Sequence, residues 1–362
     1  MLAEELPFLG ELGRILAGGC HRHGAHRSPS LQSAKRAQTR AFVCYTWPKF
    51  SLTLPVSTAY ITHPSSLLHD MGPYHPECPD RLTSIADALV GSGLDAYLTH
   101  YEAPQATDAQ LARVHGRDYI AALKAASPSA GLHYIDPDTA MCPDTLAAAQ
   151  HAAGAAVLAT DLVAGGTCTT AFCAVRPPGH HAERHRAMGF CLFNNVAVGA
   201  MHALHEHGIE RVAVVDFDVH HGNGTEDVFA NDPRVLMVGT FQHPLYPYSG
   251  TENVAPNMVN IPLSAGSGSD AFRAAVRDHW LPALDAQRPQ IIYVSAGFDA
   301  HREDPLANLR LTDADYAWVT RELIAVAKRH AAGRIVSTLE GGYALPALGR
   351  SAVEHVRELV AG

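Results

Sequence analysis

Residues 212–224 read VAVVDFDVHHGNG, and this stretch indicates both the fold and the chemistry of the chain. Four apolar residues precede the first carboxylate, as in a strand covered on both faces of a sheet. Because strand side chains alternate between faces, we expect Asp216, Asp218 and His220 on one side. The alternatives are a solvated strand end or a salt-bridged core. Buried carboxylates without a partner are unfavourable, so the pattern favours a bound metal ion.

The same apolar, β-branched pattern recurs along the chain. Strands are predicted at 169–175, 211–219, 234–240, 290–296 and 334–339, and helices at 144–164, 192–207, 269–287, 313–331 and 346–360. This alternation is typical of an α/β domain with a mainly parallel sheet. Helix 313–331 has the clearest boundaries, because Thr312 can cap its start, Asp315 follows three residues later and Gly333 lies past its last turn.

Composition excludes several classes of protein. The 362 residues are 47% hydrophobic and 17% charged, with a net charge of −9, which indicates a globular protein without a basic footprint for nucleic acid. No apolar run is long enough to predict a membrane span. The seven cysteines form no C-x-x-C pair, so we expect a reducing, cytoplasmic location. The 23 histidines direct attention to metal binding and proton transfer.

Residues 1–55 differ from the rest of the chain. They contain seven Lys or Arg and three acids, a net charge of +4, and no acidic residue follows Glu11 within this segment. Little apolar surface is available for burial, so we predict a poorly ordered basic extension. An organelle-targeting segment and a polybasic arm that binds a partner are the alternatives.

A second acidic group can complete the metal site. Asp299 follows another apolar run, in AGFDAHRED at 296–304. The carboxyl ends of parallel strands meet at one edge of a sheet, so Asp299 can join Asp218 and His220. Two carboxylates and one imidazole leave a coordination position open, as catalytic zinc sites do, although Fe(II), Co(II) or Mn(II) accept the same donors. Alone, Gly-Phe-Asp would indicate only a turn.

Two further segments carry groups for proton transfer. In RPPGHH, at 176–181, the prolines and glycine are expected to present His180 and His181 together. Adjacent imidazoles with different partners can differ in pKa, as general acid–base catalysis requires. A second pair of metal ligands, or two loop histidines with local hydrogen bonds, would be the alternative. In LEGGY, at 339–343, Tyr343 can donate to a developing oxyanion, although Gly-Gly-Tyr alone usually marks a turn.

Six segments in this order resemble the histone deacetylase superfamily, bacterial class II-like members in particular: HPECPDRL (75–82), RPPGHH (176–181), GFCLFNN (189–195), DFDVHHGNGTE (216–226), SAGFDAHREDPL (295–306) and LEGGY (339–343). The resemblance covers nearly all of residues 57–355. It implies an arginase/deacetylase-like three-layer α/β/α sandwich with a mainly parallel sheet, with the catalytic domain at 56–362. It also implies an amidohydrolase that removes the acyl group of N-acetyl-lysine, or a related small acyl amide, with a zinc-activated water.

The resemblance assigns roles by motif position. The zinc ligands match Asp218, His220 and Asp299. The general base and acid matches His181, and the other catalytic groups match His180, Tyr343, Asp216 and Asn223, the last two being partners of the imidazoles. The substrate channel matches Gly189, Phe190, either Tyr246 or Tyr248, and Leu306. A structural potassium ion would lie beside Asp216, Asp218, His220 and 239–240. Gly239 can offer only main-chain atoms where many members carry Ser.

Several alternatives remain open at this point. Leu306 stands where acetylpolyamine deacetylases carry an acid, which favours acyl-lysine in a protein or a small acyl amide as substrate. An arginase-like ureohydrolase would need two manganese ions and more bridging aspartates than the sequence offers. A catalytically silent acyl-lysine binder would not need the full proton-transfer set. We expect no nucleic acid and no membrane as partners, and a homo-oligomer is one option.

Overall fold

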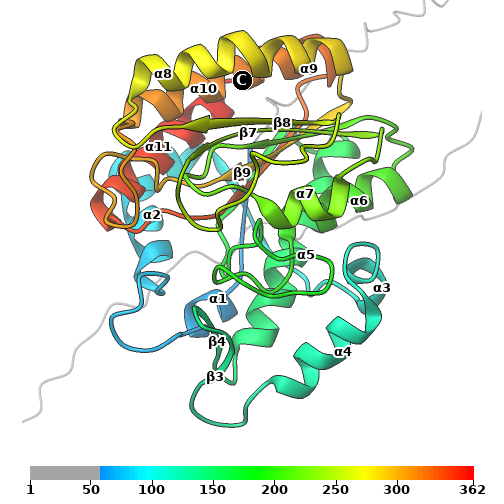
Figure 1. Ribbon diagram of the computed structural model, residues 1–362, viewed down its shortest axis with the longest axis vertical. Helices are drawn as coiled ribbons and strands as arrows, with labels where there is room; N and C mark the ends of the chain where they lie inside the picture. Colours follow the sequence, from blue (N-terminus) through cyan, green and yellow to red (C-terminus); the bar gives the residue numbers. More distant parts are fainter. Residues whose placement is uncertain (1–57) are drawn as a thin grey trace, which may run out of the picture. The chain divides into compact units, whose positions relative to one another are not determined.

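The computed structural model describes residues 58–362, so the predicted extension over 1–55 lies outside the described residues. The fold is built on an eight-stranded sheet in the order β2-β1-β5-β10-β9-β6-β7-β8 (Figure 1), and all neighbouring strands are parallel. The strands are β1 (Thr58–Thr62), β2 (Leu98–Glu102), β5 (Thr170–Cys173), β6 (Val212–Asp216), β7 (Val235–Gln242), β8 (Met258–Leu263), β9 (Ile291–Ala296) and β10 (Ile335–Leu339). All five predicted strands are confirmed, and β1, β2 and β8 were not predicted.

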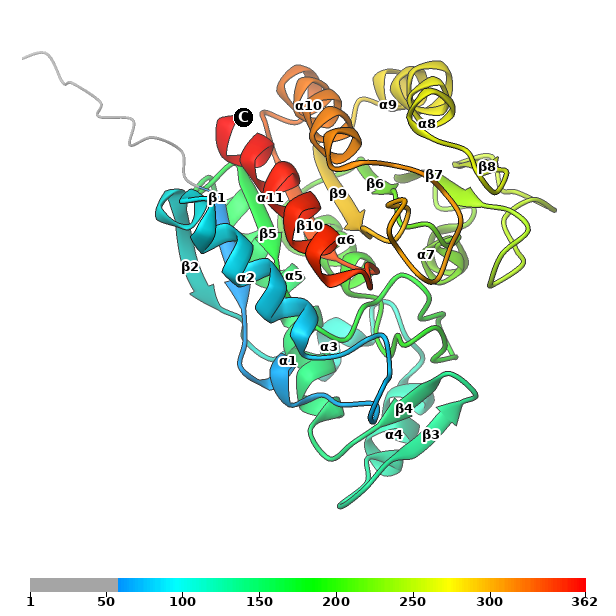
Figure 2. The same cartoon turned by 90° about the vertical axis from the view of Figure 1, so that its left-hand side faces the viewer.

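Helices cover both faces of this sheet, as Figure 2 shows. One face packs on α2 (Asp80–Gly91), α8 (Ser269–Ala275), α9 (Leu281–Gln287), α10 (Asp313–His330) and α11 (Leu345–Ala361). The other packs on α3 (Asp108–Leu111), α4 (Arg117–Ala126), α5 (Thr145–Ala164), α6 (Asn195–Glu206) and α7 (Asn223–Phe229). Within β6, Val212 and Val214 belong to one core, and Ala213 and Val215 to the other. The three-layer α/β/α sandwich is therefore confirmed.

The predicted helices are confirmed with small changes at their boundaries. At the start of α10, the Asp315 carboxylate accepts hydrogen bonds from the backbone N–H (2.9 Å) and hydroxyl (2.9 Å) of Thr312. Gly333, with φ +82°, follows the end of the same helix. The helix predicted at 269–287 contains a π-helical segment, Val276–Trp280, just before Pro282. A proline has no N–H to donate to the preceding turn, which explains a local change of helical pitch.

One described helix, α5, is long and apolar enough by length and composition to cross a membrane. In this fold 61% of its most apolar window is buried. Its Thr160 hydroxyl lies 2.6 Å from the Tyr293 hydroxyl of β9, inside one of the two cores. Helix α5 is accounted for as a core helix of the sandwich.

The segments between these elements are partly structured. Residues 131–143, which lie outside the predicted strands and helices, contain an antiparallel hairpin of β3 (His133–Asp136) and β4 (Thr139–Met141). The segment at 241–268 contains β8 as an edge strand. Short helical pieces occur at α1 (Ser65–Leu68) and Leu94–Tyr97. The sequence did not predict these short elements, because elements of three to six residues give little periodic signal.

Candidate active site

The predicted site residues lie at the carboxyl edge of four neighbouring strands, β5, β10, β9 and β6. His180 and His181 follow β5, Tyr343 follows β10 and Asp299 follows β9. Strand β6 ends at Asp216, so the prediction that strand geometry continues to residue 219 was wrong. The backbone bends after Asp216, and its carboxylate accepts the N–H of Asp218 (3.0 Å). The parallel sheet thus brings four segments to one edge.

The three predicted metal ligands lie close together at this edge of the sheet. Donor atoms of Asp218, His220 and Asp299 all lie within 4.8 Å of one another. Nδ1 of His220 is 3.0 Å from Oδ1 of Asp218 and 3.2 Å from Oδ2 of Asp299. Backbone N–H groups fix both carboxylates: Gly341 donates to Asp218 (2.8 Å) and Val219 donates to Asp299 (2.8 Å). Oδ2 of Asp299 is buried and has no hydrogen-bond partner.

The electrostatics of this cluster fit a divalent cation. Burial raises the pKa of Asp299 to about 7, and the charge of Asp218 adds to that effect. Burial would lower the pKa of His220, but the two adjacent carboxylates, Asp218 and Asp299, raise it to about 10. The cluster therefore favours positive charge at its centre. Two carboxylates and an imidazole are donors that zinc accepts, and the orphaned oxygen of Asp299 supplies a free lone pair.

The two adjacent imidazoles have different partners. Nδ1 of His180 is 3.0 Å from the Asp216 carboxylate, and Nδ1 of His181 is 2.7 Å from the Asn223 amide oxygen. The ring centroids are 4.0 Å apart. Since an amide oxygen only accepts, His181 donates through Nδ1 and keeps the lone pair of Nε2. The tautomer of His181 is thus set for accepting a proton.

The partners also separate the two pKa values. Burial would lower the pKa of His180, but the charges of Asp218 and Asp216 raise it well above the ordinary value. Burial, together with the charges of His180 and His220, holds the pKa of His181 well below the ordinary value. At neutral pH one imidazole is charged and its neighbour is neutral. This agrees with the expectation that a carboxylate and an amide would distinguish them.

A cavity of about 200 Å³ opens onto these groups. Its lining includes eight predicted residues: His180, His181, Gly189, Phe190, His220, Tyr246, Leu306 and Tyr343. Asp216 and Asn223 do not line it and act through the imidazoles they contact. Tyr248, the alternative to Tyr246 for the channel wall, is 74% exposed and outside the lining, so Tyr246 is the one of the two that lines the cavity. Its φ of +61° after Pro247 turns the chain away.

Glycine is required at two positions of this cavity. Gly189 has φ +57°, and a Cβ there would lie 2.4 Å from Cδ2 of His181. A Cβ at Gly341 would lie 2.0 Å from Oδ2 of Asp299. Both distances are shorter than any non-bonded carbon contact, so a larger residue would displace a predicted base or ligand. The glycines of GFCLFNN and LEGGY therefore allow the backbone to approach the site.

Comparison with known proteins identifies the family. Residues 75–359 match the model of the histone deacetylase domain. The chain belongs to the histone deacetylase family. The histone deacetylase-like amidohydrolase of Pseudomonas aeruginosa is 39% identical over 84% of this chain and 81% of that protein. The crystal structure of the HDA15 HD domain superposes with a TM-score of 0.79 at 33% identity, over 84% of this chain and 88% of that one.

A third similar protein is named as a polyamine deacetylase. The mouse polyamine deacetylase HDAC10 is 35% identical over 84% of this chain and 48% of that protein. Members of the histone deacetylase family hydrolyse carbon–nitrogen bonds other than peptide bonds, and this chain is an amidohydrolase of that kind. The fold and the enzyme class agree with the family.

Three acidic residues of the site were not singled out from the sequence. Asp138 lines the cavity and accepts the N–H of Gly189 (3.1 Å). Asp304 accepts the backbone N–H of Tyr343 (2.7 Å). Glu340 accepts the N–H groups of Gly179 (2.6 Å) and His180 (3.1 Å), and burial raises its pKa to about 7. Asp304 and Glu340 stand inside recognised motifs, so an acid beside an expected ligand or donor was an available signal.

Proposed function

We propose that the chain is a zinc-dependent deacetylase that hydrolyses the acetyl amide of N-acetyl-lysine or a related small acyl amide. The observation that supports this most is the pairing of a neutral His181 with a charged His180 beside the cluster of Asp218, His220 and Asp299. A binder has no use for two imidazoles in opposite protonation states, so the geometry favours catalysis over a silent acyl-lysine binder.

Zinc would be held by Asp218, His220 and Asp299. When bound, it would supply Lewis-acid polarisation of the amide carbonyl and a lower pKa for water at the site. Fe(II) or Co(II) would fit the same mixed donors. The buried, unpartnered oxygen of Asp299 supports a cation at this position.

Residues of the chain carry out the proton transfer and stabilise the charge that develops on the substrate. Nε2 of His181 accepts the proton of the attacking water and returns it to the leaving amine. His180 stays protonated beside Asp216 and stabilises negative charge near the reacting carbonyl. Burial keeps the pKa of Tyr343 well above its ordinary value, so its phenol remains a hydrogen-bond donor to the oxyanion. Phe190, whose ring centroid is 6.0 Å from that of Tyr343, narrows the cavity.

The cavity wall favours acyl-lysine over acetylpolyamine. Leu306 lines the cavity, and its N–H is fixed by the Asp304 carboxylate (3.0 Å). An apolar side chain offers no charge to attract the secondary ammonium groups of a polyamine. The alternative, an acetylpolyamine deacetylase, is kept because of the similarity to the mouse polyamine deacetylase. In Leu306→Glu, turnover of N-acetylspermidine should rise relative to that of the peptide.

The deciding experiment is acetate release by the zinc-loaded protein from an N-acetyl-lysine peptide and, in parallel, from N-acetylspermidine. We expect peptide turnover that His181→Ala abolishes. The matched control is His202→Ala, which removes a largely buried imidazole from α6 outside the cavity and should retain activity. Turnover of the polyamine alone would establish the alternative. Bound zinc without turnover of either substrate would favour a silent binder.

A potassium site, a cellular location and a class of substrate are also proposed. We infer a main-chain potassium site near Asp216 and Gly239, which are register partners on β6 and β7. The described cysteines, 78, 142, 168, 173 and 191, are all free thiols, which supports a reducing, cytoplasmic location. The expected substrate partner is acetylated lysine in a protein, without nucleic acid or membrane, and a homo-oligomer remains a proposal.

A further inference from the structure

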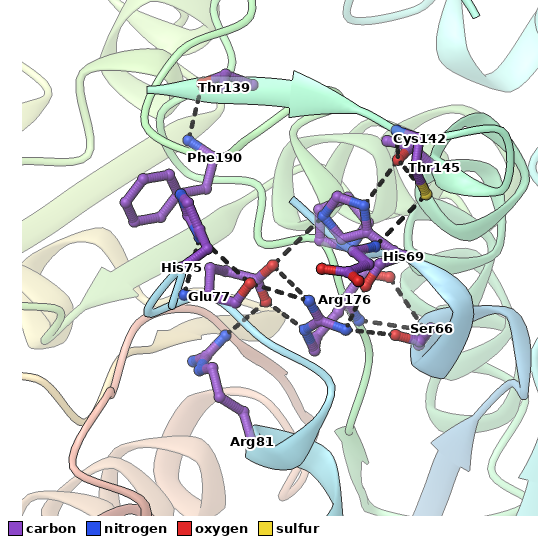
Figure 3. A network of polar contacts seen from close by, with 12 residues as sticks. Ser66, His69, His75, Glu77, Arg81, Thr139, Cys142, Thr145, Arg176 and Phe190 are labelled. Atoms are coloured by element: carbon purple, nitrogen blue, oxygen red, sulfur yellow. Dashed lines mark hydrogen bonds and ion pairs between the residues drawn. The ribbon is translucent and has the colours of Figure 1, made fainter. Parts of the chain in front are cut away.

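A buried carboxylate, Glu77, connects two arginines beneath the active site (Figure 3). Glu77 lies just before α2, and its side chain and those of Arg81 and Arg176 have no solvent exposure. Oε1 of Glu77 accepts from Arg81 (3.1 Å) and from Nε of Arg176, and Oε2 accepts from Nη2 of Arg176 (2.6 Å). One acid therefore binds two guanidinium groups at once.

The first arginine fixes the start of the histidine loop. Arg176 is the first residue of RPPGHH, four positions before His180. Its Nη1 donates to the carbonyls of Ser66 (2.6 Å) and His69 (3.1 Å). Its backbone N–H donates to the Ser66 hydroxyl (3.2 Å), and its carbonyl accepts from that hydroxyl (3.0 Å). The strand end that carries His180 and His181 is thus tied to α1 through the guanidinium that Glu77 binds.

The second arginine fixes the loop of Tyr343. Nε of Arg81 donates to the carbonyl of Gly342 (2.7 Å), and Nη2 donates to the carbonyl of Glu340. The guanidinium carbon lies 5.0 Å from the centroid of the Tyr343 ring. Arg81 therefore determines the path of LEGGY on both sides of Gly341, which is also the donor to Asp218.

Stability alone does not account for this cluster. Buried ion clusters can often be replaced by apolar side chains without loss of stability, because desolvation offsets the attraction between charges. The hydrogen bonds of Arg81 and Arg176 instead end on the two loops that carry the proton acceptor and the phenolic donor. These groups must act on the same scissile amide, and a displacement of about 1 Å can reduce a rate by about 100-fold.

We propose that Glu77 is a positioning residue that sets the distance between the His180–His181 loop and the Tyr343 loop. The inference rests on the proposed function, because it assigns both loops to one reaction. In Glu77→Gln the volume is kept, but one oxygen becomes an NH₂ group facing guanidinium donors. Whichever oxygen is replaced, at least one hydrogen bond between residue 77 and a guanidinium is lost, and the loop that this arginine holds is less restrained.

The test compares Glu77→Gln with a matched buried acid outside the site. Asp315 has no solvent exposure and accepts from Arg273 (2.8 Å) and from the Ser269 hydroxyl (2.7 Å), so Asp315→Asn removes a similar charge. In the zinc-loaded full chain, we expect kcat of Glu77→Gln on the acetyl-lysine peptide to fall about tenfold or more, with KM changed less than about twofold. Asp315→Asn should retain the kcat of the parent.

Hydrogen–deuterium exchange supplies a readout independent of activity. Amide exchange in Glu77→Gln should accelerate in both 176–181 and 340–344, whereas Asp315→Asn should accelerate exchange only around 269–273 and 312–315. Arg81→Lys keeps a cation beside Glu77 but cannot hold two carbonyls in the same fork. It should accelerate exchange at 340–344 alone, and it serves as the test if Glu77→Gln does not fold.

Each outcome bears on one claim. A parent protein that does not turn over the peptide overturns the proposed function, while the exchange pattern still tests the positioning role. An active parent with unchanged kcat and unchanged loop exchange in Glu77→Gln overturns the inference. Uniformly faster exchange over the whole chain in Glu77→Gln also overturns it, because the residue would then be only structural.

Discussion

Two clusters of aspartate and histidine in the described part of the chain satisfy the same geometric requirement for a metal. Asp218, His220 and Asp299 form one at the carboxyl edge of the sheet, and Asp161, His202 and His207 form the other between α5 and α6. In both, the donor atoms lie within 4.8 Å of one another. The clusters differ in how their charges and lone pairs are already used.

The helical cluster is satisfied by the protein itself. Arg113, which can only donate, lies 3.0 Å from Nδ1 of His202, so Nε2 of that ring carries the proton and donates to Asp161 (2.8 Å). His207 contacts the same oxygen (2.7 Å), and the Asp161 side chain is 48% exposed. Solvent and the two imidazoles stabilise this carboxylate, so no cation is required.

The cluster at the sheet edge holds two buried carboxylates, and one oxygen of Asp299 has no partner. Burial raises the pKa of Asp299 to about 7, which measures how poorly the protein solvates that charge. Donor atoms that lie close together therefore do not by themselves define a metal site. A buried negative charge that the protein leaves unsatisfied is the more informative sign.

Bound zinc distinguishes the two clusters most directly, and we expect the greatest change in this measurement. Asp218→Ala should lose bound zinc and about 1,000-fold or more of activity, because a ligand and a buried charge disappear together. Asp161→Ala should keep one zinc per chain and its activity. Elemental analysis after dialysis against zinc, together with acetate release, measures both. Two zinc ions per parent chain, or equal loss in both variants, would contradict the distinction.

The shape of the cavity above the first cluster gives the next largest effect. In Gly189→Ala the new methyl group would meet the His181 ring at 2.4 Å, so kcat/KM should fall about 100-fold. Gly166→Ala is the matched control, since Gly166 has a similar φ of +76° but no atom within 4 Å. Both should lose roughly 1–2 kcal/mol of stability through backbone strain. Equal kinetics in the two variants would show that the close approach is unimportant.

His355 is a buried histidine outside both clusters, and hydroxyl groups are its partners. His355 has no solvent exposure, lies between the hydroxyls of Thr320 (2.6 Å) and Ser337 (2.8 Å), and burial lowers its pKa to about 3. The unfolded chain binds this proton below about pH 6.5. Stability from the neutral ring is therefore present above pH 6.5 and is lost as the pH falls towards 3.

The loss from this one group should reach about 2 kcal/mol between pH 7 and pH 5. His355→Gln lacks the titrating group, so its free energy of unfolding should fall less over that range. Urea unfolding of both proteins at the two pH values gives the difference. Parallel curves would mean that the pKa of His355 is not lowered in the folded protein.

The smallest expected effect is a shift in the pH profile when Asn223, the partner of His181, is replaced. Asn223→Asp places a carboxylate beside Nδ1 of His181, which raises the pKa of that ring. Because His181 acts as a base only when neutral, the acidic limb of the kcat/KM profile should move up by about one pH unit. Asn223→Ala removes the acceptor without adding charge and should move the limb the other way. A limb that stays fixed in both variants would assign it to another group.

Sequence alone predicted the central sheet because its strands are continuous apolar runs. It did not predict β1 or β2, where Tyr60 is the largest apolar side chain in a short strand and edge strand β2 alternates weakly. The strand expected to continue to residue 219 ends at Asp216, because the Asp216 carboxylate captures the N–H of Asp218. That capture is a side-chain hydrogen bond, which hydrophobic periodicity does not report.

The site residues were predictable to the extent that they follow apolar strands. The ligands and imidazoles carry that signal, and the structure brings them together. Glu77 and Asp138 precede helical or irregular segments, so their roles depend on contacts with distant residues. The sequence did not distinguish Tyr246 from Tyr248 for the channel wall, because no residue type around Pro247 indicates that Tyr248 has a positive φ.

The position of β10 in the sheet has a consequence for biosynthesis. This strand is the last in the sequence, yet it lies between β5 and β9 and carries the loop that reaches Tyr343. A nascent chain that lacks it holds two half-sheets with no shared ladder, and the residues around the cluster of Asp218 cannot close over it. We therefore expect the proposed zinc ion to be acquired only after nearly the whole catalytic domain has been translated, so that a ribosome-bound chain stalled before residue 335 should retain no zinc.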